Sequence, residues 1–363
     1  MKAVVMRNQQ LTCEERPIPQ PLAGQVLVRT RACGICGSDL HLMKHGHRLN
    51  KLAEKSGLHT GMRFNTDMNQ DLIMGHEFSA EILEYGSGSS KPLPIGNLVT
   101  SMPLLLQGER IMPLGLSNEL IGGYAEYMLL QEALMISVPE GIPASVAAFT
   151  EPLAVGLHAV EAADYTGAPL ALVAGCGPVG LAVICCLKAK GIDVIATDLS
   201  EDRRQLAKLA GADQVWDARD ASIYSHFNQQ LLPEDYEPGS LGAIMGLQGV
   251  PRPGIIFECV GKSGILSDLI AYAPQDAQII SVGACMEAET FEPLFATYKQ
   301  LRLRFVLGYT PEEFSQCLDW ISSGAVSVEP LITRKVGIEQ LAPAFESLLT
   351  NPKDGKVMMI SEN

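Results

Sequence analysis

This sequence has few cysteines, no excess of positive charge and no long apolar run, and each shortage excludes a class of protein. The net charge of −14 over 363 residues argues against a nucleic-acid partner, because proteins that bind nucleic acid usually carry a basic face. Nine cysteines in this length are too sparse for a disulfide scaffold. No run approaches the roughly 18 apolar residues of a membrane span. We therefore expect neither nucleic acid nor a membrane as a partner.

The first residues also lack the pattern of a secretory leader. Met1–Val5 does not have the architecture of a signal peptide. We predict a reduced, cytoplasmic setting, where cysteines more often bind metal, do chemistry or fill the core than form disulfides. The hydrophobic content of 47% with only 19% charge indicates a globular protein, and the length suffices for about two domains.

Short alternating strands dominate the first part of the chain. Gln25–Ala32 and Phe78–Tyr85 show the period-two pattern of half-buried strands, and glycine or proline turns separate such segments. Residues 42–60 differ, because their pattern predicts an amphipathic helix. The first part is therefore predicted to be a small, barrel-like β domain.

Near residue 150 the pattern changes to strands that alternate with helices. Leu170–Ala174 is apolar throughout, as expected for a strand that is buried on both faces. Further strands are predicted at Val194–Thr197, Ile255–Glu258 and 278–283. This alternation is typical of the α/β class with a parallel, doubly wound sheet.

A glycine-rich turn at Gly175–Gly180 follows the first of these strands and opens a helix. Its sequence G-C-G-P-V-G fits the G-x-G-x-x-G pattern, whose glycines allow a tight turn, close approach of a pyrophosphate and close packing of helix on strand. Asp198 ends the next strand, as the pattern requires. Its carboxylate would bind both ribose hydroxyls of NAD and repel the 2′-phosphate of NADP, although Arg203 and Arg204 could offset that repulsion. The turn predicts NAD over NADP; the structural alternative is a tight turn in another α/β fold.

The stretch Ala32–His41, A-C-G-I-C-G-S-D-L-H, carries a thiol, a hydroxyl, a carboxylate and an imidazole in close succession. Zinc takes four ligands from cysteine, histidine and carboxylates, and a catalytic site leaves one position open. Cys36, His76 and one or both of Glu77 and Glu151 would supply such a set. Taken singly, each could instead be a buried thiol, a core histidine or a surface carboxylate. The dinucleotide turn downstream favours the zinc site.

With these motifs in place, the chain resembles a zinc-dependent member of the medium-chain dehydrogenase/reductase superfamily, nearest the branch of sorbitol, threonine and butanediol dehydrogenases. The motifs follow the family's order over nearly the whole chain: G-I-C-G-S-D-L-H at 34–41, G-H-E at 75–77, E-P-L-A-V at 151–155, G-C-G-P-V-G at 175–180, and Asp198.

The resemblance implies the fold and the order of the domains. A GroES-like β-barrel catalytic domain would comprise 1–152 and 295–363, and a Rossmann NAD-binding domain would occupy 153–294 between them. The active site would lie in the cleft. The resemblance further implies a homodimer or homotetramer built on the edges of the Rossmann sheet, and the strand at 278–283 is a candidate edge.

The resemblance also implies which residues hold the metal and the cofactor. Cys36 and His76 match zinc ligands, Glu77 matches a direct ligand in the polyol branch, and Glu151 matches the position that supplies the remaining ligand or exchanges with water. Whether Glu77 or Glu151 completes the zinc stays open. The residues assigned to the cofactor are Gly175, Gly177, Pro178, Val179, Gly180, Asp198, Arg203, Val260, Val282 and Gly283.

The proton path is implied in the same way. Ser38 matches the hydroxyl that takes the substrate proton, and His41 matches the outer end of the relay. Asp39 would support the metal site by holding His76 in one orientation.

The sequence departs from the family in two places. It has no cysteine between Cys36 and Cys176, whereas many relatives carry four closely spaced cysteines for a structural zinc. We predict one catalytic zinc and no structural zinc, with apolar packing such as Met102–Leu106 holding that lobe. The segment 42–72 is longer than the family usually has, so it is expected to reshape access to the site.

The resemblance implies a zinc-dependent oxidoreductase that transfers hydride between a secondary alcohol or polyol and NAD. The alkoxide would be stabilised on zinc, and the proton would leave through Ser38 and His41. Two alternatives stay open: a zinc-free NADPH-dependent reductase of quinones or enones from the same superfamily, and a cofactor-binding protein without catalysis. The sequence does not name the alcohol.

Overall fold

The computed structural model describes residues 1–56, 66–167, 170–234, 236–237, 239–245, 247–248, 251–350 and 353–361. Contacts along the backbone divide the chain into two compact units. The first unit joins Met1–Ala154 to Thr310–Asn363, and the second unit is Val155–Tyr309. Within the long segment at 42–72, residues 57–65 lie outside the described part, and so does the end of the helix predicted at 42–60.

The first unit is built on β-sheet. Its strands are β1 (Lys2–Arg7), β2 (Gln10–Glu15), β3 (Gln25–Gly34), β4 (Glu77–Tyr85), β5 (Leu98–Ser101), β6 (Leu104–Gln107), β7 (Arg110–Pro113), β8 (Tyr127–Gln131), β9 (Met135–Ser137), β16 (Ile332–Val336) and β17 (Lys356–Ile360). The main sheet has the order β16-β17-β3-β4-β5-β9, and β8 also pairs with β3; β1–β2 and β6–β7 are separate two-stranded sheets. The β domain predicted for the first part of the chain is confirmed.

The first unit also contains helices, of which α1 is the longest. They are α1 (Gly37–Ser56), α2 (Ala144–Ala147), α10 (Pro311–Ser323) and α11 (Leu341–Thr350), with the 3-10 turns η1 (Glu132–Leu134), η2 (Glu329–Leu331) and η3 (Ile338–Gln340). The helix α3 (Thr150–Glu161) begins in the first unit and ends in the second. Because α1 begins at Gly37 and not at residue 42, the second half of the stretch Ala32–His41 forms the first turns of a helix.

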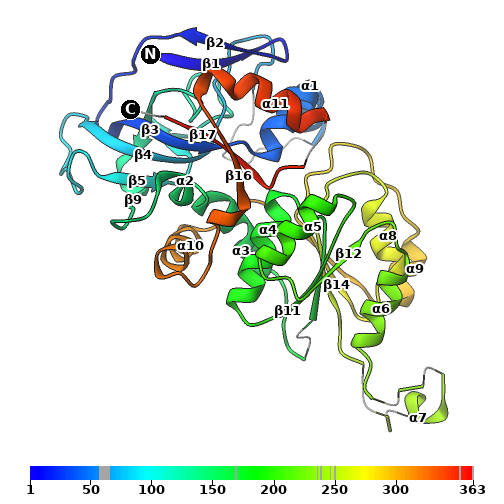
Figure 1. Ribbon diagram of the computed structural model, residues 1–363. Helices are drawn as coiled ribbons and strands as arrows, with labels where there is room; N and C mark the ends of the chain where they lie inside the picture. The colour runs from blue at the N-terminus through cyan, green and yellow to red at the C-terminus, as the bar shows by residue number, and fades with distance from the viewer. Residues whose placement is uncertain are drawn as a thin grey trace. The chain divides into compact units, whose positions relative to one another are not determined.

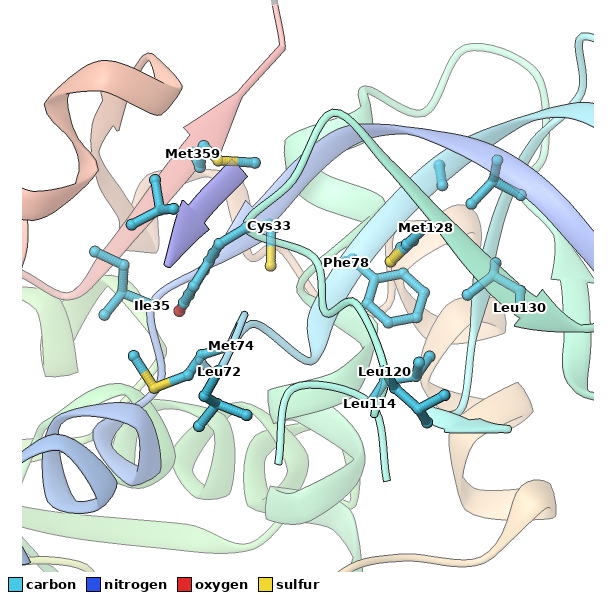
Figure 2. Packing of buried hydrophobic residues seen from close by; sticks show 14 of the residues in the cluster. Cys33, Ile35, Leu72, Met74, Phe78, Leu114, Leu120, Met128, Leu130 and Met359 are labelled. Carbon is cyan, nitrogen blue, oxygen red and sulfur yellow. The ribbon is translucent and has the colours of Figure 1, made fainter. Parts of the chain in front are cut away.

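One cluster of buried apolar side chains fills the first unit. Figure 2 shows Cys33, Phe78 and Met128 among its members. Cys33 is wholly buried and is part of this packing. Leu105 of β6 and Met112 of β7 belong to the same cluster, so apolar side chains anchor the β6–β7 hairpin.

The register of three strands brings distant parts of the chain to one end of the main sheet. The central strand β3 pairs with β4 on one side and with β17 on the other, both antiparallel. Gly34 is opposite Glu77 in β4 and opposite Met358 in β17. The end of β3, the start of β4 and the start of β17 therefore meet, next to the start of α1.

The second unit is a parallel sheet. Its strands are β10 (Leu170–Ala174), β11 (Asp193–Asp198), β12 (Gln214–Asp217), β13 (Ile255–Glu258), β14 (Gln278–Ser281) and β15 (Arg302–Phe305). They lie in the order β12-β11-β10-β13-β14-β15, and every neighbouring pair is parallel. The predicted doubly wound α/β fold is confirmed.

Helices cover both faces of this sheet, as Figure 1 shows. They are α4 (Pro178–Ala189), α5 (Glu201–Leu209), α6 (Ser222–Gln230), α8 (Ile265–Tyr272) and α9 (Pro293–Tyr298), whereas α7 (Leu241–Ile244) lies apart from the sheet. Phe227 of α6 and Leu269 of α8 pack on one face together with Ile256 of β13, and α3, α4 and α5 lie on the opposite face (Figure 1). No helix in the described ranges combines the length and the apolar character needed to span a membrane.

Two expectations for the second unit need correction. Residues 278–283 are not at an edge, because β14 is hydrogen-bonded to β13 on one side and to β15 on the other. The strand at this edge of the sheet is β15, and β12 forms the opposite edge. The second boundary between the units lies after Tyr309 and not after residue 294. The reason is that β15 is hydrogen-bonded to β14 and so belongs to the unit that contains the parallel sheet. The first boundary falls after Ala154, close to the expected residue 152.

Candidate active site

Three of the four expected zinc ligands lie together in the first unit. Ligand atoms of Cys36, His76 and Glu77 all lie within 4.8 Å of one another, the only such group of three or more found among the described residues. Cys36 directly precedes α1, and Glu77 begins β4. The strand register described above brings these segments together, so residues far apart in the sequence form one donor set of thiol, imidazole and carboxylate.

The carboxylate of Asp39 lies beside the imidazole of His76. The Asp39 side chain is fully buried, and its Oδ1 lies 3.4 Å from Nδ1 of His76. Its Oδ2 accepts hydrogen bonds from the Cys36 backbone N–H at 3.0 Å and from the Tyr124 hydroxyl at 2.5 Å. A carboxylate facing Nδ1 favours the tautomer with its proton on that atom, which leaves the Nε2 lone pair for a metal.

Ser38 lies beside the other ring nitrogen of the same histidine. Its Oγ is 3.3 Å from Nε2 of His76, so the hydroxyl is next to the nitrogen that is left for the metal. His41 lies one helical turn further along α1. It makes no hydrogen bond to this cluster among the described residues, and its pKa is below the ordinary value of 6.5 because it is partly buried and because His45 and Lys44 lie close to it.

A buried lysine occupies the other side of Glu77. Lys356, the first residue of β17, places its Nζ 2.7 Å from both carboxylate oxygens of Glu77 and 3.3 Å from the Ile35 carbonyl. Both side chains are 1% exposed. Burial by itself lowers the pKa of Lys356, but the charges of Glu77 and Cys36 outweigh it, so the net shift is upward. The lysine therefore stays charged and neutralises Glu77.

Glu151 is near this site but outside the group of three. It lies in the first turn of α3 and is 6% exposed. Its charge contributes to the raised pKa of Lys356. Among the described residues the structure thus assembles Glu77, and not Glu151, with Cys36 and His76.

The donor set fits a zinc ion. Cysteine sulfur, histidine nitrogen and a carboxylate oxygen are the ligands that zinc prefers, and three of them leave a fourth position open. Burial and the charge of Glu77 raise the pKa of Cys36. Burial lowers the pKa of His76, but the charges of Asp39 and Cys36 raise it well above its ordinary value. A divalent ion would displace protons from both groups and supply the positive charge that this buried cluster favours.

Sequence reasoning missed two residues that support the cluster. Tyr124 donates through its hydroxyl to Asp39 and, at 3.0 Å, to the Gly34 carbonyl. Lys356 holds Glu77 in place. The available signals were faint: a tyrosine after two glycines, and a lysine that begins an otherwise apolar strand, K-V-M-M-I.

The dinucleotide turn of the second unit has the geometry that its glycines predict. Gly175 has a φ of +94°, and a Cβ on Gly180 would lie 1.8 Å from the Gly175 carbonyl oxygen. A Cβ on Gly177 would meet nothing closer than 3.7 Å, the distance to Nη1 of Arg203. Protein packing thus demands glycine at 180 but not at 177. An open space at the N-terminus of α4, next to a cation, fits a pyrophosphate.

Asp198 is fixed at the end of β11. Its two carboxylate oxygens accept from the backbone N–H groups of Cys176 and Ser200, each at 2.8 Å. Arg204 is engaged by the Asp198 carbonyl and by the carboxylate of Asp217. Arg203 forms no ion pair within the described residues, and its Nε is buried without a partner. Of the two arginines, Arg203 is thus the one that faces the turn.

The remaining cofactor residues gather at the ends of β13 and β14. Val260 lies against the turn, because a Cβ on Gly175 would be 2.8 Å from its Cγ2. The N–H groups of Val282 and Gly283 both donate to the Glu258 carbonyl at 2.9 Å, while the Glu258 carboxylate accepts from the Val260 N–H at 2.7 Å. Pro178 and Val179 begin α4. The turn and both strand ends therefore line one edge of the sheet, where ligands bind in such folds.

Comparison with protein families agrees with both units. A family model described as zinc-binding dehydrogenase matches residues 178–323, and one described as an alcohol dehydrogenase GroES-like domain matches residues 22–140. The chain belongs to the zinc-dependent alcohol dehydrogenases of the medium-chain dehydrogenase/reductase superfamily. This confirms the family, the GroES-like first unit and the Rossmann-like sheet of the second, and it makes the chain an oxidoreductase.

Individual relatives cover nearly the whole chain of this dehydrogenase. It is 28% identical to (R,R)-butanediol dehydrogenase of Bacillus subtilis, over 99% of each chain. It is 27% identical to sorbitol dehydrogenase of Homo sapiens, over 93% of this chain and 89% of that one. The crystal structure of 2R,3R-butanediol dehydrogenase from Bacillus subtilis superposes with a TM-score of 0.78, at 26% identity and 99% coverage of each chain.

Proposed function

We propose that this dehydrogenase oxidises a secondary alcohol or polyol with NAD, and catalyses the reverse reduction, using a zinc ion held by Cys36, His76 and Glu77. The observation that carries the proposal is the donor set itself, with its ligand atoms within 4.8 Å of one another and the Ser38 hydroxyl 3.3 Å from His76. The butanediol and sorbitol dehydrogenases among its relatives support this substrate class. We place the reaction in the cytoplasm, in keeping with cysteines that are all free thiols.

The zinc and the NAD supply the chemistry that side chains cannot. When bound, the ion polarises the oxygen of the alcohol as a Lewis acid, and NAD accepts the hydride from its carbon. The protein positions these groups. Asp39 holds His76 in the tautomer that a metal needs, and Lys356 holds Glu77 in place and balances its charge. Glu151, buried close by, is the carboxylate that would supply the remaining ligand or exchange with water.

The proton of the alcohol leaves along α1. Ser38 lies beside the metal-facing nitrogen of His76, so its hydroxyl accepts the proton of the substrate. His41 is three residues later on the same helix, a spacing that places side chains on one face. Because the pKa of His41 is lowered from 6.5 by burial, His45 and Lys44, its imidazole is neutral near pH 7 and ready to accept a proton at the outer end of the path.

The second unit favours NAD over NADP. Asp198 is held by two backbone N–H groups, so its carboxylate occupies a fixed place where the ribose hydroxyls of NAD bind. Arg204 is engaged elsewhere. The free guanidinium of Arg203 lies against Gly177, which suits the pyrophosphate that NAD and NADP share.

We also propose that the enzyme is a homodimer or a homotetramer in which β15 pairs with its counterpart in a second copy. β15 is the last strand of the parallel sheet. Apolar side chains on and beside it are exposed, including Phe305 at 67%, Leu307 at 85% and Tyr298 at 75%. An exposed strand edge with apolar flanks is a template for pairing with another chain.

Substitution of the ligands tests the reaction. Cys36→Ala and His76→Ala should each lower kcat for NAD-linked alcohol oxidation by more than about a thousandfold, because the Lewis acid is lost, while NAD binding by fluorescence persists. Cys13→Ala, which removes an exposed cysteine of the same unit, is the matched control and should be fully active. Full activity of a verified zinc-free Cys36→Ala variant would refute the proposal.

A further inference from the structure

The helix α1 carries histidines that the proposed reaction does not use fully. His41, His45 and His47 follow one another within its first three turns. His41 and His45 are four residues apart and therefore share a face of the helix. The centroids of their rings lie 6.2 Å apart, with the ring planes inclined at 33°.

These two imidazoles are also without competing partners. Neither His41 nor His45 makes a hydrogen bond or ion pair within the described residues, and neither has a ring nitrogen buried without a partner. In contrast, His226 is hydrogen-bonded to Gln214 and Gln230. The ring nitrogens of His41 and His45 thus reach solvent with their lone pairs unused.

Two histidines at this spacing on one helical face form a chelating pair. The same i, i+4 arrangement supplies two of the zinc ligands in metalloprotease helices. An ion bound at about 2.0–2.1 Å from each nitrogen requires the rings to close slightly from their present separation, which rotation of the half-buried side chains allows. His47 does not join the pair, because it lies two residues after His45 and therefore points to another face of the helix.

We propose that His41 and His45 bind a second divalent transition-metal ion, with water completing its shell, and that this ion inhibits the enzyme. Imidazole ligands select Zn²⁺, Ni²⁺ and Cu²⁺ over Mg²⁺ and Ca²⁺. With two protein ligands against three at the proposed zinc site, the pair holds its ion more weakly. Inhibition rests on the proposed function, because an ion on His41 blocks the outer end of the proton path, whereas binding does not depend on that function.

The test is a titration of zinc-loaded enzyme with Ni²⁺ at pH 7.5, followed by calorimetry and by measurement of released zinc. The wild type should bind one extra equivalent without releasing zinc. His45→Gln should weaken that binding at least tenfold, whereas His47→Gln, which removes a histidine of the same helix outside the pair, should bind like the wild type. Mg²⁺ should not bind in any of the three.

Activity and spectroscopy complete the test. Ni²⁺ should inhibit alcohol oxidation by the wild type and by His47→Gln at concentrations at least tenfold below those needed for His45→Gln. The electron paramagnetic resonance spectrum of the zinc-loaded wild type with one equivalent of Cu²⁺ should show two nitrogens bound to the copper. This measurement uses only the wild type, so it does not depend on whether a variant folds. Equal Ni²⁺ binding by wild type and His45→Gln, or binding that only displaces the resident zinc, overturns the proposal. If the enzyme showed no dehydrogenase activity, only the proposed function would be rejected. Calorimetry would still decide whether His41 and His45 bind the second ion.

Discussion

Glu77 takes part both in a buried ion pair and in the proposed metal site. Its carboxylate is buried, paired at 2.7 Å with the ammonium of Lys356, and grouped with Cys36 and His76 as a possible metal ligand. Lys356 lies 279 residues further along the chain. A charged pair in the interior repays its desolvation only while both partners are present, so the folding of the first unit and its proposed metal binding depend on the same carboxylate.

Loss of the lysine should therefore destabilise the metal-free enzyme. We expect Lys356→Met to lower the free energy of unfolding by about 3–5 kcal/mol, because Glu77 is left as a buried, unpaired charge. The double variant Glu77→Gln/Lys356→Met should recover most of that loss, since no charge remains. Urea unfolding of the three zinc-free proteins measures both effects. Equal stability of Lys356→Met and the wild type would contradict a buried pair.

Gly34 provides a sharper test of the place of Glu77. A Cβ at this position would lie 2.1 Å from the Glu77 Oε2, so Gly34→Ala must push the carboxylate out of place. We expect zinc content and melting temperature both to fall. Gly37→Ala is the matched control, because a Cβ there meets nothing within 4 Å and alanine suits a helix. Metal analysis by mass spectrometry should find a full complement of zinc in Gly37→Ala; equal zinc in Gly34→Ala would count against Glu77 as a ligand.

The sequence predicts the residues of this site better than it predicts their supports. Cys36, His76 and Glu77 are residue types that bind zinc, and as a set upstream of a dinucleotide turn they predict a metal site; the structure brings them together. Tyr124 and Lys356 carry no such signal. Their roles arise from the packing of β3 between β4 and β17, which is a tertiary contact that local patterns do not encode.

At the scale of elements, the glycines of the glycine-rich turn have different roles: one is required for folding and another for the proposed binding of the cofactor. Gly180 is required by the protein, since its Cβ would lie 1.8 Å from the Gly175 carbonyl oxygen. Gly177 has a φ of −71° and open space around it, so only a ligand gives a reason for glycine there.

Two alanine substitutions should therefore have different consequences. Gly180→Ala should destabilise the second unit and reduce the yield of folded protein. Gly177→Ala should fold with the melting temperature of the wild type but bind NAD at least tenfold more weakly, because the methyl group fills the space of the pyrophosphate. Calorimetric titration with NAD provides the measurement. If Gly177→Ala bound NAD normally, the pyrophosphate would have to lie elsewhere.

Element boundaries show where sequence patterns fail. The apolar strands β10, β13 and β14 were recognisable because both of their faces are buried. β15, with the sequence R-L-R-F and side chains that are largely exposed, has no such signature, so the sheet was expected to end one strand too early. The amphipathic pattern predicts the helix α1 at 42–60 and leaves out its first turn, G-S-D-L-H. Its true start at Gly37 puts Ser38 and His41 on a rigid element.

At the scale of the whole molecule, the exposed edge at β15 predicts self-association. Light scattering should give the wild type a mass that is a multiple of the 39.1 kDa chain. Phe305→Asp should shift this mass towards the monomer, because a charge at an apolar interface is costly. Leu209→Asp is the control, since Leu209 is 60% exposed on the same unit but lies on α5. A wild-type mass that Phe305→Asp leaves unchanged would exclude this edge as the interface.

The proposed reaction needs both units, one for the metal and one for the cofactor, and removal of the metal tests it most directly. The purified enzyme is assayed with NAD on a panel of secondary alcohols, diols and polyols, then after zinc is removed by a chelator, and again after one equivalent of Zn²⁺ is restored. The expected result is NAD-linked oxidation of at least one member of the panel, lost with the zinc and regained with it, while NAD binding stays constant. Undiminished activity in the zinc-free enzyme would contradict the central claim.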